Sequence, residues 1–144
     1  MPHLTVHGPQ AVSPRTEDLA NRVQAARFAR RALSEYLGEY GFLRGPDGET
    51  SEQAEAALLA VSELVTNACR HTAGPQSMSM ALCDGLLHLE VSDSSRVVPR
   101  IVPPEERGAS GGFGLNLVAE LVDSWAVVTN SQGKKIQAQL TISR

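Results

Sequence analysis

The order of apolar and polar residues predicts two long helices in the first half of the chain. Apolar residues recur at three- and four-residue spacing between about Thr16 and Tyr40, which is typical of an amphipathic helix. The apolar stripe of this helix comprises Val23, Ala26, Ala29, Leu33, Leu37 and Tyr40. A second helix is expected from about Ser51 to Thr72, because Ser51 is a favourable cap and Gly74-Pro75 would end the helix.

Alternation of apolar and polar residues predicts strands in other parts of the chain. The expected strands are residues 4–6, 77–83, 86–92, 125–129 and 135–142. Asp84-Gly85 separates the second and third of these, and this dipeptide is typical of a two-residue hairpin turn of type I′. Asn130 to Gly133 separates the last two strands, which we expect to form a closing hairpin.

A third helix, Leu115 to about Val122, is expected after the glycine-rich stretch Gly111-Gly112-Phe113-Gly114. Residues 93–110 show no period and contain three prolines, so we expect a functional loop there. This order of elements predicts an α+β fold, a two-layer α/β sandwich in which about three helices cover one face of a mainly antiparallel mixed sheet. The length of 144 residues suits a single domain spanning residues 1–144.

Composition narrows the classes of function. The formal net charge of −3 argues against general affinity for nucleic acid or anionic membranes. The longest apolar run, Ala56 to Val61, is too short to span a bilayer, and the first ten residues show no signal-peptide pattern. Cys69 and Cys83 form no metal-binding cluster, so we expect reduced thiols in a cytoplasmic protein, with a disulfide or a redox sensor as the alternative.

The second helix carries the first candidate site. At 100° per residue, Glu63, Asn67 and His71 lie within about 80° of one another. Apolar residues fill the opposite arc, namely Leu58, Val61, Leu64, Val65, Ala68 and Cys69. The Asn67 oxygen can ligate Mg²⁺, which takes its other ligands from phosphates and water, and Glu63 can orient or deprotonate an attacking hydroxyl. On these residues alone, a solvated polar face is the alternative.

Two more features have potential chemistry. Gly111, Gly112 and Gly114 stand at a helix start, where glycine permits close approach of a ligand and free N–H groups can bind phosphate. Asp93 follows an apolar strand and can accept a hydrogen bond from an adenine amino group. Taken singly, these residues would equally fit a glycine-rich turn and a turn-forming aspartate.

The order and spacing of these features resemble a known family. The chain reads ELVTNACRHT at 63–72, then a hairpin, Asp93, a loop, and GGFGLNLVAELVDSW at 111–125. This series resembles the sequence boxes of the GHKL ATPase superfamily, whose domains have the Bergerat fold. Within the superfamily, the chain is most similar to the small bacterial anti-sigma-factor serine kinases. The resemblance extends from about Val23 to Leu140.

The resemblance implies a role for each matching residue. Asn67 would ligate Mg²⁺, Glu63 would be the general base toward a serine or a water, and Asp93 would hold the adenine amino group of ATP. Contacts with the bound nucleotide are also implied for Gly111, Gly112, Gly114 and Leu115. Residues 93–111 would form an ATP lid. His71 matches a recurring family position among the nucleotide-binding residues, although a local hydrogen bond would explain it equally well.

Two departures from the family pattern matter. The glycines that usually follow the aspartate are replaced by Ser94 to Val98, so the loop lacks its usual hinge residues. Relatives often carry a threonine that helps to hold adenine at the position of Lys135. The departures leave open an altered nucleotide preference or a loss of nucleotide binding.

The implied function is that of an ATP-binding anti-sigma-factor serine/threonine kinase. Such a protein would bind a sigma factor, phosphorylate a STAS-type anti-anti-sigma protein and be switched by exchange of these partners. The alternative is a protein-interaction module of the same fold with weak or no nucleotide binding. A split sensor histidine kinase is less well supported, because no stretch resembles a dimerisation and phosphoacceptor helix pair. Phe28 lies off the apolar stripe of the first helix, which is compatible with a homodimer.

Overall fold

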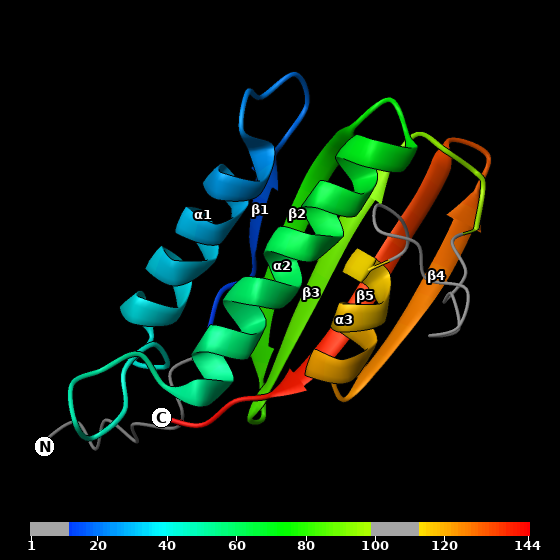
Figure 1. Ribbon diagram of the computed structural model, residues 1–144. Coiled ribbons are helices and arrows are strands. Elements are labelled where there is room, and N and C mark those ends of the chain that lie inside the picture. The colour runs from blue at the N-terminus through cyan, green and yellow to red at the C-terminus, as the bar shows by residue number, and fades with distance from the viewer. Residues whose placement is uncertain (1–11, 99–112) are drawn as a thin grey trace, which may run out of the picture.

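The computed structural model describes residues 12–98 and 113–144, which form two layers (Figure 1). One layer is an open five-stranded sheet with the strand order β1-β2-β3-β5-β4, in which every described pairing is antiparallel. In the other layer, the helices of the described ranges cover one face of this sheet. The elements are β1 (Arg15–Asp18), α1 (Ala25–Glu39), α2 (Glu52–His71), β2 (Pro75–Cys83), β3 (Leu86–Asp93), α3 (Phe113–Leu121), β4 (Ser124–Asn130) and β5 (Gly133–Thr141). The predicted α+β sandwich is confirmed.

The two predicted hairpins are present. In the β2–β3 turn, Asp84 and Gly85 have φ angles of 51° and 78°, as a type I′ turn requires. The β4–β5 turn is held by Asn130, whose side-chain Oδ1 accepts hydrogen bonds from the N–H groups of Gln132 and Gly133 at 2.7 and 3.0 Å. Because the strands alternate, one face of the sheet is apolar and packs against the helices.

The helix α2 occupies the middle of the helical layer and packs against both α1 and α3. The Ser51 hydroxyl caps it by accepting a hydrogen bond from the N–H of Ala54 at 3.1 Å. Its buried residues are Ala54, Ala57, Leu58, Ala60, Val61, Leu64, Val65 and Ala68. The helix and its apolar arc are therefore confirmed, except that Cys69 is exposed. Cys69 lies in the last turn of the helix, at the margin of the arc.

The first helix begins later than predicted. Residues 15–18 form the edge strand β1 and pair with β2, a long-range pairing that the local sequence does not predict. Asn21 and Gln24 have left-handed φ angles of 60° and 57°, which interrupt a right-handed helix before Ala25. Val23, expected in the apolar stripe, consequently lies outside α1 and is 89% exposed.

Phe28 has partners within the chain. Its side chain is partly buried against the core, and the guanidinium of Arg22 lies 3.6 Å from the centroid of its ring. Phe28 therefore packs within the chain, and the possible homodimer stays a prediction.

Tyr36 anchors α1 to the edge of the sheet. Its hydroxyl donates a hydrogen bond to the carbonyl oxygen of Ser13 and accepts one from the N–H of Leu82, each at 3.1 Å. Burial raises the pKa of the Tyr36 hydroxyl above its ordinary value. The residue thus satisfies a backbone donor of β2 beyond the end of its pairing with β1.

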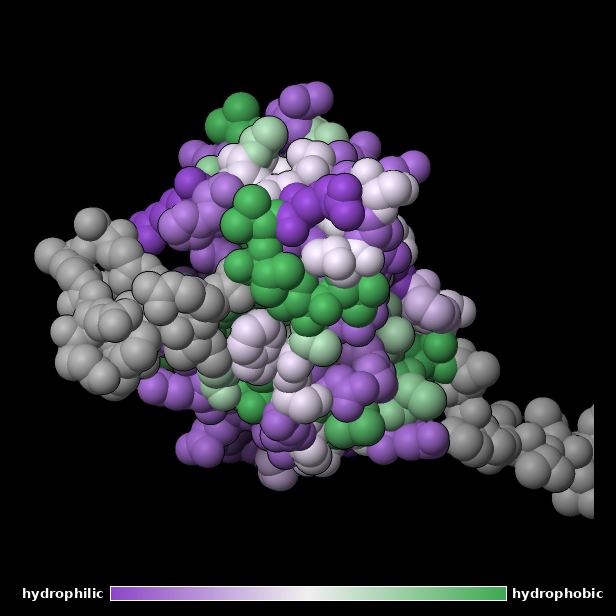
Figure 2. All heavy atoms as spheres, turned by 90° about the vertical axis from the view of Figure 1, so that its right-hand side faces the viewer, coloured by the Kyte–Doolittle hydropathy of each residue, from purple (hydrophilic) through white to green (hydrophobic). Residues whose placement is uncertain are grey.

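The side of the molecule that carries the β4 edge shows a band of hydrophobic residues surrounded by hydrophilic ones (Figure 2). On β4 itself, Val128 is exposed, whereas Trp125 and Val127 are partly buried against the core. Within residues 12–98 and 113–144, no helix is long and apolar enough to cross a membrane. The strand predicted at residues 4–6 lies outside the described residues.

Candidate functional site

Three segments that are distant in the sequence lie at one end of the two-layer structure (Figure 1). They are the last turns of α2, the end of β3 and the β4–β5 turn, whereas α3 begins nearer the middle of the sheet. Antiparallel pairing places the end of β3 beside the start of β5, so that Asp93 pairs with Lys134. The helix α3 packs against α2. The described candidate residues lie on α2, β3 and α3.

Glu63 and Asn67 lie one turn apart on α2, and both are half-buried. Their orientation is set by the apolar arc of the helix, in which Leu64, Val65 and Ala68 are buried. Within the described ranges, neither Glu63 nor Asn67 makes a hydrogen bond or an ion pair. A carboxylate and an amide oxygen are thus held on a rigid element with their acceptor atoms available.

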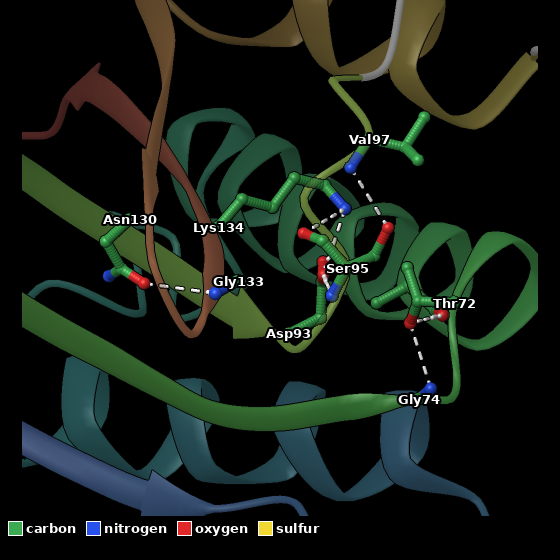
Figure 3. Close-up of polar contacts among 9 residues, drawn as sticks. Thr72, Gly74, Asp93, Ser95, Val97, Asn130, Gly133 and Lys134 are labelled. Carbon is green, nitrogen blue, oxygen red and sulfur yellow. Dashed lines mark hydrogen bonds and ion pairs between the residues drawn. The ribbon is translucent and has the colours of Figure 1, made fainter.

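The end of α2 is connected to β2 through Thr72. The Thr72 hydroxyl donates to the carbonyl oxygen of Ala68 at 2.6 Å and accepts from the N–H of Gly74 at 2.9 Å (Figure 3). Gly74 has a φ of 116°, which favours glycine at this point. His71, the last residue of α2, is exposed, and the structure describes no partner for it. The helix therefore ends in a fixed position just past Asn67.

Asp93 forms a buried ion pair with Lys134. Their side chains are joined by a contact of 2.9 Å between Nζ and Oδ1, and the residues are only 3% and 4% exposed (Figure 3). The two residues are cross-strand partners on β3 and β5, on the face that packs against the helices. Asp93 Oδ1 also accepts a hydrogen bond from the N–H of Ser95 at 2.8 Å. The expected adenine acceptor therefore already has two internal donors.

Gly133 permits the close approach that this pairing requires. Its φ is 152°, and a Cβ at this position would overlap the carbonyl oxygen of Asp93 and lie 2.8 Å from the Cα of Ser94. The β4–β5 turn is thus pressed directly against the end of β3. Only glycine fits this position without a shift of one of the two backbones.

The lysine beside Asp93 is Lys134. The comparison with the family pattern had instead pointed to Lys135. Strand residues alternate between faces, and Lys135 lies on the opposite face of β5, where its Nζ is 3.2 Å from a carboxylate oxygen of Glu90. Lys135 therefore does not lie beside Asp93 on the inner face. The buried alternation of Ile136, Ala138 and Leu140 was the signal that could have placed Lys134 on the inner face.

The first residues after β3 form consecutive turns without glycine. The N–H of Ser95 bonds to Asp93, the Ser95 hydroxyl accepts from the N–H of Val97 at 3.2 Å, and the Ser95 carbonyl oxygen lies 3.5 Å from Lys134 Nζ (Figure 3). Side chains that hydrogen-bond to the backbone thus shape this stretch up to Val98, the last described residue before the gap.

The glycine-rich part of the candidate site is described only in part. Gly111, Gly112 and most of the expected lid, residues 99–110, lie outside the described residues. Gly114 lies in the first turn of α3. Leu115 belongs to the hydrophobic core, and Asn116 beside it is also buried. The structure thus shows Leu115 in a packing role.

The described residues fit a magnesium nucleotide in part. Half-buried Glu63 and Asn67 offer the oxygen atoms that Mg²⁺ prefers, and a magnesium ion shares its shell with phosphates and water. No group of three or more His, Cys, Asp or Glu residues within the described ranges could hold a metal. A hollow of about 170 Å³ at this end of the sheet is lined by Asp93 and Lys134 together with Ser92 and Lys135 of the outer face, and its lining does not include Glu63 or Asn67. The Asp93 carboxylate can accept a hydrogen bond from a base, but it already accepts one from the Lys134 ammonium.

Comparison with known proteins identifies the family. Residues 19–140 match the profile described as the histidine kinase-like ATPase domain. The structure is similar to the RsbU and RsbW domains of Rv1364c from Mycobacterium tuberculosis, with a TM-score of 0.65 and 23% identity over 92% of this chain and 33% of that chain. It is also similar to a blue-light activated histidine kinase from Erythrobacter litoralis, with a TM-score of 0.50 and 22% identity over 88% of this chain and 42% of that chain.

These structural similarities concern the fold. The chain spans a third of the length of the Mycobacterium tuberculosis protein and less than half of the Erythrobacter litoralis kinase. A search of curated protein sequences found no match.

Proposed function

Since the chain belongs to the family of histidine kinase-like ATPase domains, we propose that it is an ATP-binding regulatory protein that acts as an anti-sigma-factor serine/threonine kinase. It would bind a sigma factor and phosphorylate a serine of a STAS-type anti-anti-sigma protein, so that phosphorylation decides which partner is held. The similarity to a structure that contains an RsbW domain supports the fold on which this proposal depends.

The observation that carries the proposal is a set of acceptor groups held on regular elements. Half-buried Glu63 and Asn67 lie one turn apart in the second half of α2, and buried Asp93 ends β3 at the end of the sheet where α2 also ends (Figure 1). Phosphoryl transfer asks a protein chiefly to position its substrates and to neutralise charge. An arrangement of acceptors on rigid elements suits that task.

Each residue would have a separate role. Asn67 would supply an oxygen ligand to Mg²⁺, which when bound neutralises phosphate charge. Glu63 would accept the proton of the attacking serine hydroxyl. Asp93 would accept a hydrogen bond from the adenine amino group and so position the nucleotide.

Thermal unfolding with and without Mg-ATP tests the nucleotide-binding part of the proposal. A ligand that binds only the folded state stabilises it by about 2.7 kcal/mol at a hundred times its Kd, so the Tm should rise with ATP concentration. Mg-GTP serves as the comparison for nucleotide preference. An unchanged Tm at millimolar Mg-ATP, together with no heat of binding in isothermal titration, would exclude ATP as the ligand.

The kinase part needs a phosphoacceptor. A STAS-domain protein from the same genome, incubated with this protein and labelled ATP, should acquire a phosphoserine that a serine-to-alanine variant lacks. Partners should be captured by pull-down in the presence and absence of Mg-ATP. If ATP binds but no STAS protein is phosphorylated, the kinase proposal fails while nucleotide binding stands.

One observation favours a second candidate, a protein-interaction module without catalysis. The Asp93 carboxylate already accepts hydrogen bonds from Lys134 and from the N–H of Ser95. An adenine amino group would therefore have to share this acceptor with two internal donors. This candidate predicts partner binding that is indifferent to Mg-ATP, so the same pull-down distinguishes the two.

A further inference from the structure

We propose that Lys134 is a base-reading residue that acts together with Asp93. The Lys134 ammonium would donate a hydrogen bond to N1 of adenine while the Asp93 carboxylate accepts one from the N6 amino group. The inference rests on the proposed function, because it assigns a specificity-determining residue to the same nucleotide site.

The pair is built as one unit. Asp93 and Lys134 face each other across the β3–β5 ladder with a separation of 2.9 Å between Nζ and Oδ1, and both are almost completely buried. Gly133 allows the β4–β5 turn to press against the backbone of Asp93. The relative position of the two charged groups is therefore fixed by the sheet and the turn rather than by flexible side chains alone.

Hydrogen-bonding capacity remains on both members. An ammonium has three donors, and the described acceptors of Lys134 Nζ are Asp93 Oδ1 at 2.9 Å and the Ser95 carbonyl oxygen at a marginal 3.5 Å. The described hydrogen bonds of the Asp93 carboxylate all fall on Oδ1. A buried pair of this kind thus offers a donor and an acceptor side by side.

The base-pairing edge of adenine complements that pair. Its N6 amino group is a donor and its neighbouring N1 is an acceptor, as in its recognition by a carboxamide. A carboxylate alone can satisfy only the amino group, because it has no donor to offer N1. A base that contacts both Asp93 and Lys134 would also give these two buried charges additional hydrogen bonds, which offset part of the cost of their burial.

Atomic substitution in the ligand tests the contact without changing the protein. Isothermal titration of the full chain with Mg-ATP and with the magnesium complex of 1-deaza-ATP, which lacks N1, should show at least about tenfold weaker binding of the analogue, the effect of losing one hydrogen bond to a charged group. Equal affinities would overturn the inference while leaving the proposed function intact. Failure of the protein to bind Mg-ATP at all would overturn the proposed function and this inference with it.

Variants identify the donor. In Lys134→Met, ATP should bind more weakly and the difference between ATP and 1-deaza-ATP should vanish, whereas Lys135→Met, which alters the neighbouring lysine on the outer face, should keep the full difference. If Lys134→Met does not fold, Lys134→Gln, which keeps a neutral donor, should show a reduced difference. A difference that persists in both variants assigns N1 to another group, and tighter ATP binding by Lys134→Met would mean that the lysine competes with the base. Either result overturns the inference.

Discussion

At the scale of single residues, the candidate site contains hydrogen-bond acceptors without a described partner and one acceptor that is held in a buried ion pair. Glu63 and Asn67 are half-buried and, among the described residues, unengaged, whereas Asp93 is buried and paired with Lys134. A substitution of Glu63 or Asn67 therefore removes an acceptor group without removing a described contact. A substitution of Asp93 or Lys134 breaks the ion pair and leaves the remaining charge buried without its partner.

Asn67→Ala should weaken Mg-ATP binding by more than about a hundredfold, because removal even of groups that only support a metal ligand costs 10- to 100-fold. The fold should be unaffected, since the apolar arc that holds α2 is unchanged. Isothermal titration measures the affinity, and circular dichroism checks the fold. Ser62→Ala on the same helix, about 140° around the axis from Asn67, is the control and should bind normally. Normal binding by Asn67→Ala would remove this residue from the site.

Glu63→Gln should leave the Kd for Mg-ATP nearly unchanged and lower the rate of phosphoryl transfer by about 100- to 10,000-fold, the usual contribution of general base catalysis. A base acts on the nucleophile and contributes little to binding of the nucleotide in the ground state. The rate is measured with a phosphoacceptor protein at saturating ATP. Glu52→Gln, in the first turn of α2, makes the same change of charge away from the site and should keep full activity. An undiminished rate in Glu63→Gln would exclude this carboxylate as the base.

At the scale of elements, the turn between β4 and β5 positions the end of β3. Asn130 holds the turn through two backbone N–H groups, and Gly133 contacts the backbone of Asp93 and Ser94. The β4–β5 turn therefore helps to fix the position of Asp93, although the two are about 40 residues apart in the sequence. The geometry of this contact depends on Gly133, which has no side chain.

Gly133→Ala should lower the free energy of unfolding by about 1–3 kcal/mol, because the added methyl group forces two backbones apart. Denaturant unfolding measures this loss. Gly48→Ala is the matched control, since Gly48 also has a positive φ, of 81°, but has no atom within 4 Å of the added Cβ. Its cost should be limited to backbone strain, about 1 kcal/mol. If the free energy of unfolding falls by the same amount in both variants, the close approach at Gly133 does not contribute to stability.

At the scale of the whole molecule, one hydrophobic core joins both layers. It extends from Leu19 beside β1 to Ile142 after β5 and includes the inner faces of all three described helices. No described element has a core of its own. The edges of the sheet at β1 and β4 should therefore unfold together with its centre.

Trp125 on β4 is the single tryptophan of the chain and reports on one edge, whereas far-ultraviolet circular dichroism reports on the helices. Denaturant unfolding followed by both signals should give coincident transitions, as expected of a two-state domain. Leu64→Ala, in the middle of α2, should lower both midpoints together at a cost of about 2–5 kcal/mol. A fluorescence transition that precedes the loss of helix would show that the β4 edge unfolds separately.

The sequence by itself determined the parts of this protein that depend on local signals. Ser51 and the apolar period predicted α2 to within a residue at each end, and Asp84-Gly85 predicted the central hairpin. The helical period also placed Glu63 and Asn67 on one polar face. These features were predictable because capping, turn geometry and helical spacing act between residues that are close in sequence.

The tertiary structure alone decided the features that depend on long-range pairing. The first helix was expected from about Thr16, but residues 15–18 form β1, because an edge of β2 is available to pair with them. Lys134 and Asp93 are 41 residues apart, and only the register of β5 against β3 places them together on the inner face. A shift of that register by one residue would have brought Lys135 inward instead, and the burial of the alternating apolar residues of β5 against the helices selects between the two.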